Sequence, residues 1–294
     1  MIPIVFAADH NFVMPTCVAI ASLLSTKKSG VEYDINIIID DDLTENDRKI
    51  LEKQVADISS GSSLHFIEIG KTFDNGFEIR EISKACYNRL MIPWLMNYDK
   101  VIYSDGDIIF NGDISDIYRI DLGEKLVAGY GGNVWKKGII KKYLKKIGAD
   151  PNEYINSGFL LINSRLQREQ NLKPKYLELA KRKFIYQDQD IINLVCKGKI
   201  GKLPAEYNVK PIDVSKFPEG SVKVIHYIGL KPWDYFTYSW NEWWSVYRRS
   251  VIFDPTFNQK ISQRILSSKY RKKINRKVIK QKINFLKNYL FFKN

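Results

Sequence analysis

Apolar-rich runs alternate along the first part of the chain with stretches in which apolar residues recur every three or four positions. Residues 2–7, 34–39 and 64–69 are apolar-rich runs of strand length, whereas residues 13–24 repeat at helical spacing. Strands alternating with helices of this length predict an α/β fold with a mostly parallel, doubly wound mixed sheet. In such sheets, ligands bind at the carboxyl ends of the strands.

The remaining elements are expected from caps and shorter apolar patterns. Thr44, with Asp47 three residues later, has the sequence of a capping box for a helix through Ile58. Ser83 is expected to cap a helix that carries Leu90. Further strands are expected at 101–103, 108–110, 126–129, 159–162 and 222–227, and further helices at 135–147, at 174–184, after a cap at Asp188, and from 256 onward.

Composition places the chain among globular proteins of a reducing compartment. The 294 residues are 45% hydrophobic, which is enough for one α/β domain with a substantial core. The three cysteines, Cys17, Cys86 and Cys196, are far apart and in no metal-ligand spacing. No basic leader precedes the first apolar run, and no uncharged apolar stretch is long enough to span a membrane. We therefore expect a cytoplasmic protein.

The net charge of +13 is concentrated at one end of the chain. Residues 256–294 contain 12 basic and no acidic residues, which leaves 34 basic and 33 acidic residues in 1–255. Because the body is nearly neutral, the charge does not indicate nucleic-acid binding by the fold. The chain is therefore expected to consist of one catalytic domain, 1–255, and an appended basic segment, 256–294.

The basic segment also has a helical apolar pattern, because Ile279, Ile283, Leu286 and Leu290 recur at helical spacing. A basic amphipathic helix is suited to lying on anionic lipid. We expect residues 256–294 to associate peripherally with the anionic inner leaflet of the cytoplasmic membrane. An ordinary helix packed on the body and a disordered tail are the alternatives.

Asp105, Gly106 and Asp107 lie between the two short apolar runs 101–103 and 108–110. Two carboxylates where a buried strand ends are suited to a hard divalent cation, which often completes its shell with substrate phosphates. The chain has two further Asp-x-Asp pairs, but only this one has apolar sequence on both sides. Gly106 also permits close approach of the backbone to a ligand. The alternative is a solvated acidic turn.

Polar residues interrupt apolar runs at other strand ends as well. Ala8, Asp9 and Asn11 follow the first strand, and His226 follows the run from 222. An imidazole there could be the third ligand of a cation already held by two carboxylates, a mixed shell that suits Mn²⁺ better than Ca²⁺. Lys231, five residues beyond the histidine, is suited to a phosphate. A hydrogen-bonded, semi-buried histidine is the alternative.

Two more segments carry several hydrogen-bonding side chains. Asn156 and Gly158 come directly before a strong strand, where the asparagine either caps a turn or binds a ligand. Residues 186–190 read YQDQD. A helix start needs only one capping acid, so the other side chains suggest recognition of a polyhydroxylated ligand, with plain capping as the alternative.

These segments, taken in order, resemble glycosyltransferase family 8, which contains bacterial galactosyl- and glucosyltransferases of lipopolysaccharide and related cell-surface glycans. The resemblance covers roughly residues 2–250, and the ordered set is more specific than any one motif. The matching segments are FAAD at 6–9 with Asn11, YNRL at 87–90, YSDGD at 103–107, NSG at 156–158, YQDQD at 186–190 and HYIGLKPW at 226–233.

The resemblance implies a single GT-A-type nucleotide-sugar-binding domain, a UDP-sugar donor, and Mn²⁺ with Mg²⁺ as the alternative. Asp105, Asp107 and His226 would bind the metal. Gln189 would lie nearest the anomeric carbon and, with Asp188, would be catalytic. The donor would contact Ala8, Asp9, Asn11, Arg89, Ser104, Asp105, Gly106, Asn156, Asp188, Gln189, Gly229 and Lys231.

The resemblance also implies that the sugar is transferred with retention of anomeric configuration. Retention ordinarily calls for a carboxylate nucleophile opposite the leaving group. Asp190 or Asp188 could serve, but front-face substitution, in which the leaving phosphate takes the acceptor proton, needs only positioning and a metal, and we favour it. The alternatives to a transferase are a nucleotide-polymer enzyme and a UDP-sugar-binding protein without activity.

The acceptor is expected to be a hydroxyl of a glycan or glycolipid. Gly131 and Gly132 stand where members of the family can carry an acid near the acceptor, so the identity of the acceptor does not follow from the resemblance. His10 also departs from the small polar or acidic residues common there.

Overall fold

The computed structural model describes residues 1–39, 41–70, 72, 84–235 and 237–266. Its centre is a seven-stranded mixed sheet of order β3-β2-β1-β4-β7-β6-β8. Strands β3, β2, β1 and β4 are parallel, β7 is antiparallel to β4 and β6, and β8 is parallel to β6. The expected fold class is confirmed. The strands are β1 (Ile2–Ala8), β2 (Tyr33–Ile39), β3 (Ser63–Glu68), β4 (Lys100–Ser104), β6 (Val127–Gly129), β7 (Phe159–Asn163) and β8 (Ile200–Lys202).

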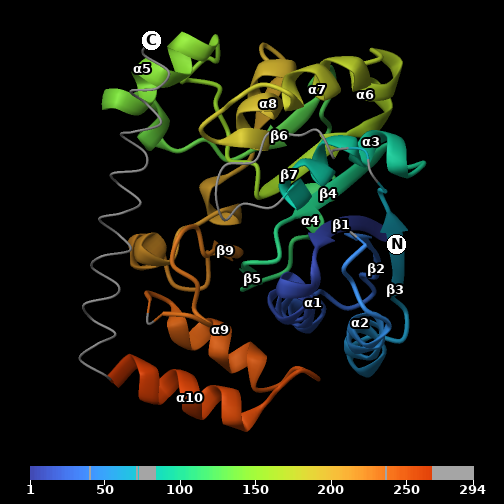
Figure 1. Ribbon diagram of the computed structural model, residues 1–294, viewed down its shortest axis with the longest axis vertical. Helices are drawn as coiled ribbons and strands as arrows, with labels where there is room; N and C mark the ends of the chain where they lie inside the picture. Colours follow the sequence, from blue (N-terminus) through green and yellow to red (C-terminus); the bar gives the residue numbers. More distant parts are fainter. Residues whose placement is uncertain (40, 71, 73–83, 236, 267–294) are drawn as a thin grey trace.

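The strand order reverses between β1 and β4. From β1 the chain first builds outward to β2 and β3, and then returns to add β4 on the other side of β1, with Ile4 opposite Ile102. At such a switch point the loops that follow the two parallel strands diverge and leave a crevice. Figure 1 shows β1 and β4 side by side. Asp9 follows β1 and Asp105 follows β4, so the fold brings both residues to the carboxyl-end edge of the sheet.

A separate two-stranded sheet lies next to this edge. It pairs β5 (Ile108–Phe110) with β9 (Val224–His226) in antiparallel register, with Ile108 opposite His226. The strand expected at 222–227 is therefore present in a shorter form. Its pairing connects residues more than a hundred positions apart, and it sets His226 beside the turn between β4 and β5.

Helices cover both faces of the large sheet. Ile4 and Phe6 of β1 pack into one hydrophobic cluster with α1, whereas Val5 packs into the cluster on the opposite face. Figure 1 shows α1 and α2 together on one side of the strands and α3, α6, α7 and α8 on the other. The α-helices are α1 (Val13–Thr26), α2 (Glu45–Ile58), α3 (Ile92–Leu95), α4 (Ser115–Tyr118), α5 (Gly138–Ile147), α6 (Ser164–Glu169), α7 (Lys173–Ala180), α8 (Gln187–Val195), α9 (Trp240–Tyr247) and α10 (Pro255–Leu266).

Two of the helix starts expected from the sequence are wrong. Asp188 does not cap α8; the cap residue is Tyr186, and Asp188 lies in the first turn. The helix expected from residue 135 begins as a 3₁₀ turn, Asn133–Lys136, and α5 starts only at Gly138, which has a φ of +56°. Local acidity and periodicity identified both helices but misplaced their first turns.

The helix expected to be capped by Ser83 is divided. The chain forms a 3₁₀ helix, Lys84–Met91, and then the short helix α3. Pro93 lies at the start of α3. Because proline has no N–H and its ring clashes with the preceding turn, it disfavours one continuous α-helix through this position. Ser83 itself lies outside the described residues.

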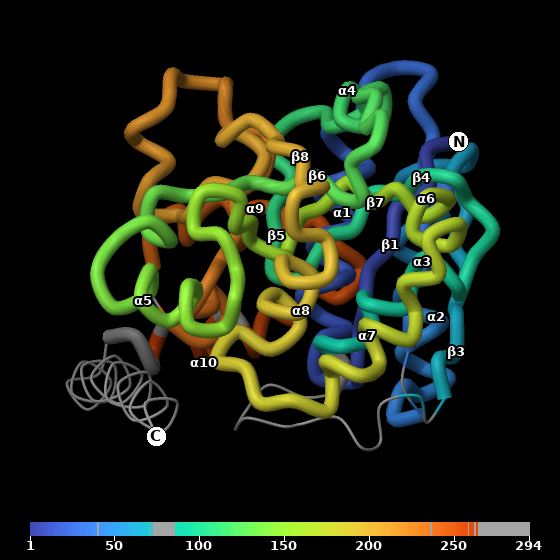
Figure 2. Tube along the Cα trace, turned by 90° about the horizontal axis from the view of Figure 1, so that it is seen from above, coloured from blue at the N-terminus to red at the C-terminus, as the bar shows by residue number. Residues whose placement is uncertain are grey.

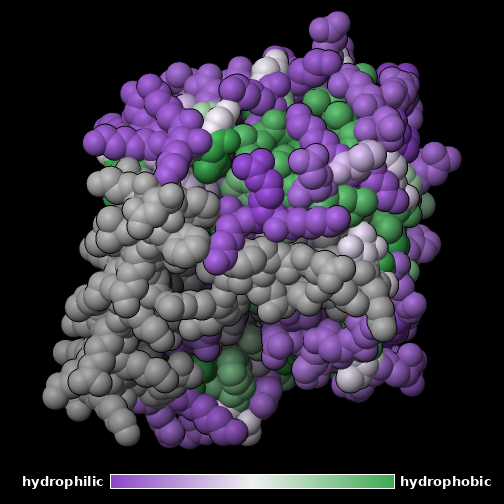
Figure 3. Space-filling model, turned by 45° about the horizontal axis from the view of Figure 1, so that its top comes forward, coloured by the Kyte–Doolittle hydropathy of each residue, from purple (hydrophilic) through white to green (hydrophobic). Residues whose placement is uncertain are grey.

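Aromatic contacts pack the start of α10 on α9. The Phe257 ring lies 5.9 Å from both the Trp244 and the Tyr247 ring, and Ile261 is buried. Residues 267–294, including the apolar positions of the expected amphipathic helix, lie outside the described residues. Within the described ranges, no helix has the length and apolar character needed to cross a membrane. Hydrophilic residues cover much of the coloured surface in Figure 3, with hydrophobic areas between them.

The capping box of α2 is confirmed, and it gives a direct test of local stability. The Thr44 side chain accepts a hydrogen bond from the Asp47 N–H, and Asp47 accepts one from the Thr44 N–H at 2.9 Å. We expect Thr44→Ala to lower the free energy of unfolding in urea by about 1 kcal/mol, because the N–H of Asp47 loses its acceptor. Thr44→Ser keeps the hydroxyl and is the control. Equal losses for the two variants would contradict the capping role.

Candidate functional site

Two aspartates and a histidine converge where β4 ends. Asp105 and Asp107 lie in the turn between β4 and β5, and His226 ends β9, the partner of β5. The His226 Nε2 lies 3.2 Å from Asp107 Oδ1 and 3.6 Å from Asp105 Oδ2. One ligand atom from each of the three residues lies within 4.8 Å of the others. The structure therefore brings together the three residues expected to bind metal.

These side chains fit a hard divalent cation. Asp107 Oδ1 is buried and accepts no hydrogen bond from the described part of the chain. The backbone of Gly158 approaches the cluster so closely that a Cβ there would lie 2.2 Å from His226 Cε1 and 2.6 Å from Asp105 Oδ2. Two carboxylates and one imidazole form a donor set suited to Mn²⁺ or Mg²⁺.

Positive groups neutralise the carboxylates. Lys231 forms an ion pair with Asp107. Burial alone would raise the pKa of Asp107, but Lys231 and His226 outweigh burial and hold the pKa well below its usual range. Asp107 is therefore ionised at neutral pH, as a metal ligand must be.

Asp105, Asp107 and His226 are called the metal cluster below. Arg89 links this cluster to the start of α8. Its guanidinium lies 2.8 Å from Asp105 Oδ1 and 3.2 Å from Asp188 Oδ2, and it stacks 4.7 Å from the centre of the Tyr103 ring. Burial would lower the pKa of Arg89, but the two carboxylates raise it well above its usual value. Burial, with Asp105, raises the pKa of Asp188, and Arg89 opposes this shift. The three residues thus form one coupled group.

The first turn of α8 has an unusual backbone. Gln187 has a φ of +42°, in the left-handed region that costs a residue other than glycine about 1–2 kcal/mol. This conformation comes immediately before Asp188 and Gln189, which are both buried. Asp188 contacts Arg89, and the Gln189 Oε1 accepts hydrogen bonds from Asn156 Nδ2 at 2.9 Å and from the backbone of the neighbouring residue 157.

Asp190 differs from its neighbours. It is fully buried, and its carboxylate accepts hydrogen bonds from the hydroxyls of Tyr143 at 2.6 Å and Tyr154 at 2.5 Å, and from the N–H of Tyr186. Burial raises its pKa to about 6. Both oxygens are held by protein donors, so Asp190 connects α8 to α5 and to the segment before β7.

Other residues expected in the site lie at the same strand ends. Asp9 caps the short 3₁₀ turn after β1 by accepting a hydrogen bond from the N–H of Phe12, and Asn11 is exposed. A Cβ on Gly106 would lie 2.5 Å from the hydroxyl of Thr16 in α1, so the turn packs tightly on this helix. Three further positions are Ala8, which is buried at the end of β1, Ser104, whose hydroxyl donates to the Asp105 carbonyl, and Gly229, which has a φ of +95°.

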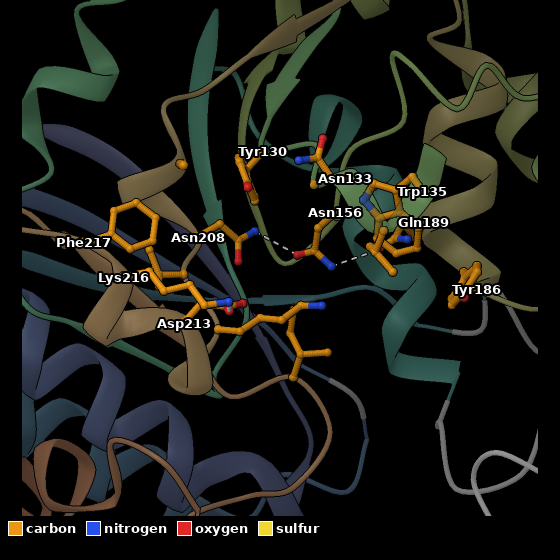
Figure 4. A pocket seen from close by; sticks show the side chains of 16 residues that line it. Tyr130, Asn133, Trp135, Asn156, Tyr186, Gln189, Asn208, Asp213, Lys216 and Phe217 are labelled. Carbon is orange, nitrogen blue, oxygen red and sulfur yellow. Dashed lines mark hydrogen bonds and ion pairs between the residues drawn. The ribbon is translucent and has the colours of Figure 1, made fainter. Parts of the chain in front are cut away.

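A cavity of about 550 Å³ opens beside Asn156 and Gln189 (Figure 4). Figure 4 shows Trp135, Gln189 and Tyr186 on one side and Phe217, Lys216 and Asp213 on the other. Most of these lining residues were not predicted from the sequence, because they lie in loops and 3₁₀ turns that have no periodic pattern. The lining also includes Tyr130, Asn133, Val134, Asn208, Lys210 and Ile228.

Asn208 was missed as well, although it lies next to the metal cluster. Its Oδ1 is 2.9 Å from His226 Nδ1, and its Nδ2 donates to Asn156 Oδ1 at 2.9 Å. Asn208 follows a 3₁₀ turn, Ala205–Tyr207, and no motif marks it in the sequence. The backbone bridge between Val209 and Ile225 of β9 helps to set it beside the histidine.

Comparison with known structures defines the class of this fold. The structure of galactosyltransferase LgtC in complex with donor and acceptor sugar analogs superposes with a TM-score of 0.74 and 24% sequence identity, over 88% of this chain and 100% of that chain. The expected GT-A-type fold is confirmed. Figure 2 shows the corresponding strands from above, with β3 at one side of the molecule and α5 at the other.

The family model for glycosyl transferase family 8 matches residues 3–237, and the chain belongs to this family. A putative glycosyltransferase of Haemophilus influenzae is 27% identical over 71% of this chain and 64% of its own length. The lipopolysaccharide 1,2-glucosyltransferase of Escherichia coli is 29% identical over 51% of this chain and 49% of its own length. The chain thus spans less than two thirds of these two relatives.

Gly158 provides a test of the metal cluster. We expect Gly158→Ala to weaken Mn²⁺ binding by about tenfold or more, because the added methyl group displaces Asp105 or His226. Mn²⁺ affinity can be measured from the paramagnetic signal of the free ion. Gly132→Ala is the matched control, because its Cβ would come no closer than 3.7 Å to other atoms. Unchanged affinity in Gly158→Ala would show that the cation binds elsewhere.

Proposed function

We propose that the protein is a retaining hexosyltransferase that moves glucose or galactose from a UDP-sugar to a hydroxyl of a cell-surface glycan. The observation that carries the proposal is the convergence of Asp105, Asp107 and His226 beside Arg89 and Gln189 in a family 8 chain. A cation site and a set of polar groups suited to a sugar therefore lie within one site, as transfer from a nucleotide-sugar requires.

The metal in the proposal is Mn²⁺, with Mg²⁺ as the alternative. Asp105, Asp107 and His226 would hold it, and a bound divalent cation stabilises the charge that develops on a diphosphate leaving group. Lys231 would add a positive charge next to the same diphosphate, and Gly229 would let the backbone approach it. Uracil and ribose would contact the first strand end through Ala8, Asp9 and Asn11, with Ser104 and Gly106 nearby.

The donor sugar would lie between the metal cluster and α8. Arg89 and Asp188 would bind its hydroxyl groups, since their charges are already paired and oriented. Asn156 supports the position of Gln189, which lines the cavity. We propose Gln189 and Asp188 as the catalytic residues on this side of the sugar.

The burial of Asp190 favours front-face substitution. A nucleophile must present a free oxygen to the anomeric carbon, whereas both Asp190 oxygens accept hydrogen bonds from tyrosines. In the proposed step, the bond between the anomeric carbon and the diphosphate breaks while the acceptor oxygen bonds to the same face. The acceptor proton passes to the departing phosphate oxygen, so configuration is retained without a covalent intermediate.

The cavity beside Gln189 is the proposed acceptor site. It is lined by Tyr130, Trp135 and Tyr186, whose ring faces suit a sugar. A glycan or glycolipid acceptor agrees with the named activity of the Escherichia coli relative, a lipopolysaccharide glucosyltransferase. We propose that the protein acts in the cytoplasm at the inner leaflet, with residues 256–294 as its contact with anionic lipid.

Release of UDP tests the proposed activity without knowledge of the acceptor. We expect Mn²⁺-dependent UDP release from UDP-glucose or UDP-galactose, since water can replace the acceptor. Asp107→Asn should lower the rate at least about a hundredfold, as expected when charge stabilisation of the leaving group is lost. Donor binding without release by the native protein, under any metal tested, would instead support a UDP-sugar-binding protein.

Deletion of residues 267–294 tests the membrane contact and leaves the packed start of α10 in place. We expect the truncated protein to lose binding to vesicles that contain anionic lipid, because most basic residues of the segment are removed. Vesicle sedimentation at low and high salt measures the effect, with UDP release as the control for folding. Unchanged sedimentation would rule out this segment as the membrane contact.

A further inference from the structure

A continuous chain of side-chain amides joins the metal cluster to the donor-sugar side of the site. The His226 Nδ1 lies 2.9 Å from Asn208 Oδ1, Asn208 Nδ2 donates to Asn156 Oδ1 at 2.9 Å, and Asn156 Nδ2 donates to Gln189 Oε1 at 2.9 Å. Figure 4 shows the last two of these hydrogen bonds as dashed lines. His226, Asn208 and Gln189 are all buried.

Two backbone N–H groups determine the direction of this chain. The Gly158 N–H donates to Asn156 Oδ1 at 3.0 Å, and the Ser157 N–H donates to Gln189 Oε1 at 3.2 Å. A backbone N–H can only donate, so the atoms that face these groups must be the amide oxygens. Asn208 must then turn its NH₂ group toward Asn156 and its oxygen toward His226.

The orientation of the Asn208 amide determines which ring nitrogen of His226 carries a proton. Because Asn208 presents an oxygen, His226 must carry its proton on Nδ1 to form the hydrogen bond. When a cation is bound, the lone pair is then on Nε2, the atom that lies near Asp105 and Asp107. Hydrogen bonds of this kind fix the tautomer and orientation of metal-binding histidines and raise their affinity.

At its other end, the series of amides determines which hydrogen-bonding atoms of Gln189 are available to a ligand. Its Oε1 already accepts two hydrogen bonds, and its Nε2 donates to the hydroxyl of Tyr154 at 3.2 Å, which in turn donates to Asp190. An amide oxygen has two lone pairs and the NH₂ group has two hydrogens. Within the described part of the chain, one N–H of Gln189 therefore remains for a ligand, and both lone pairs of its oxygen are used.

We propose that Asn208 and Asn156 are positioning residues that hold His226 in the metal-binding tautomer and turn the N–H of Gln189 toward the donor sugar. This inference rests on the proposed function for the identity of the two ligands. The hydrogen bonds within the protein do not depend on either ligand. One buried amide network thereby sets the geometry of both the metal and the sugar side.

The first test reads the histidine tautomer directly. The chain has only three histidines, so long-range ¹H–¹⁵N spectra of the metal-free protein can be assigned by replacing His10 and His65. We expect the Nδ1 of His226 to carry a proton, because it faces the Asn208 oxygen. An unprotonated Nδ1, as in the tautomer that free imidazole prefers, would overturn the proposal without any variant of Asn208.

The second test measures Mn²⁺ affinity in variants of Asn208. Asn208→Leu removes the acceptor, and we expect its dissociation constant for Mn²⁺ to rise by about tenfold or more. Asn208→Asp keeps an oxygen for His226 and should bind Mn²⁺ close to the native value. Asn36→Leu, which removes a buried amide in β2 far from the site, is the control for the loss of an amide as such.

A third variant separates the two ends of the network. Asn156→Asp keeps the oxygen that accepts from Asn208 but places a second oxygen against Gln189 Oε1. We expect near-native Mn²⁺ affinity and UDP release lowered by about tenfold or more, through kcat and not through the KM for the donor.

The outcomes distinguish the network from the proposed function. Native Mn²⁺ affinity in Asn208→Leu, or native UDP release in Asn156→Asp, would overturn the positioning role. Equal losses in Asn208→Leu, Asn208→Asp and Asn36→Leu would show a general packing effect and would also overturn it. If the native protein bound no Mn²⁺ and released no UDP, the proposed function would fail, and the tautomer of His226 would still decide whether the network operates.

Discussion

The central constraint on this structure is the convergence of three carboxylates in one small site, two of them buried and Asp105 half-buried. Asp105, Asp107 and Asp188 would repel one another strongly in a dry environment. Arg89 lies between Asp105 and Asp188, and Lys231 pairs with Asp107, so each carboxylate has a positive partner. The side chains of Arg89 and Lys231 therefore determine how the metal cluster, the start of α8 and the loop after β9 pack together.

The fold meets this constraint by joining segments that are distant in sequence. The parallel strands β1 and β4 deliver their polar ends to one edge, and β9 pairs with β5 to bring His226 to the same place. Because Gly158 has no side chain, the segment that leads into β7 can lie in contact with the metal cluster. The residues proposed to bind the metal thus also lie where the large sheet meets the two-stranded sheet.

Local sequence patterns were sufficient for the parallel half of the sheet and for the acidic turn between β4 and β5. The strands have a clear apolar pattern, and the acids that follow β4 stand out because apolar residues flank them on both sides. The capping box at Thr44 was also clear, because both of its hydrogen bonds are local. The strand β8 was not expected, because it reads IGK and lacks the apolar run that marks the equally short β5. The helix α6 was not expected either, since its six residues are too few to show a period.

Contacts between distant segments explain the remaining differences. Asp188 has the sequence of a helix cap, but a buried Arg89 offers it a stronger partner than a backbone N–H. Asn208 has no distinguishing neighbours in the sequence and comes to lie beside His226 through contacts of its segment with β9 and the residues before it. The cavity lining likewise comes from several segments that are distant in sequence, so no local pattern marks it.

The most direct test of this account is a crystal structure with Mn²⁺ and UDP, with data collected at a wavelength where manganese scatters anomalously. The account requires one strong anomalous peak bounded by Asp105, Asp107 and the Nε2 of His226, with the diphosphate next to it and close to Lys231. A peak outside this cluster, or one coordinated by His226 through Nδ1, would contradict it.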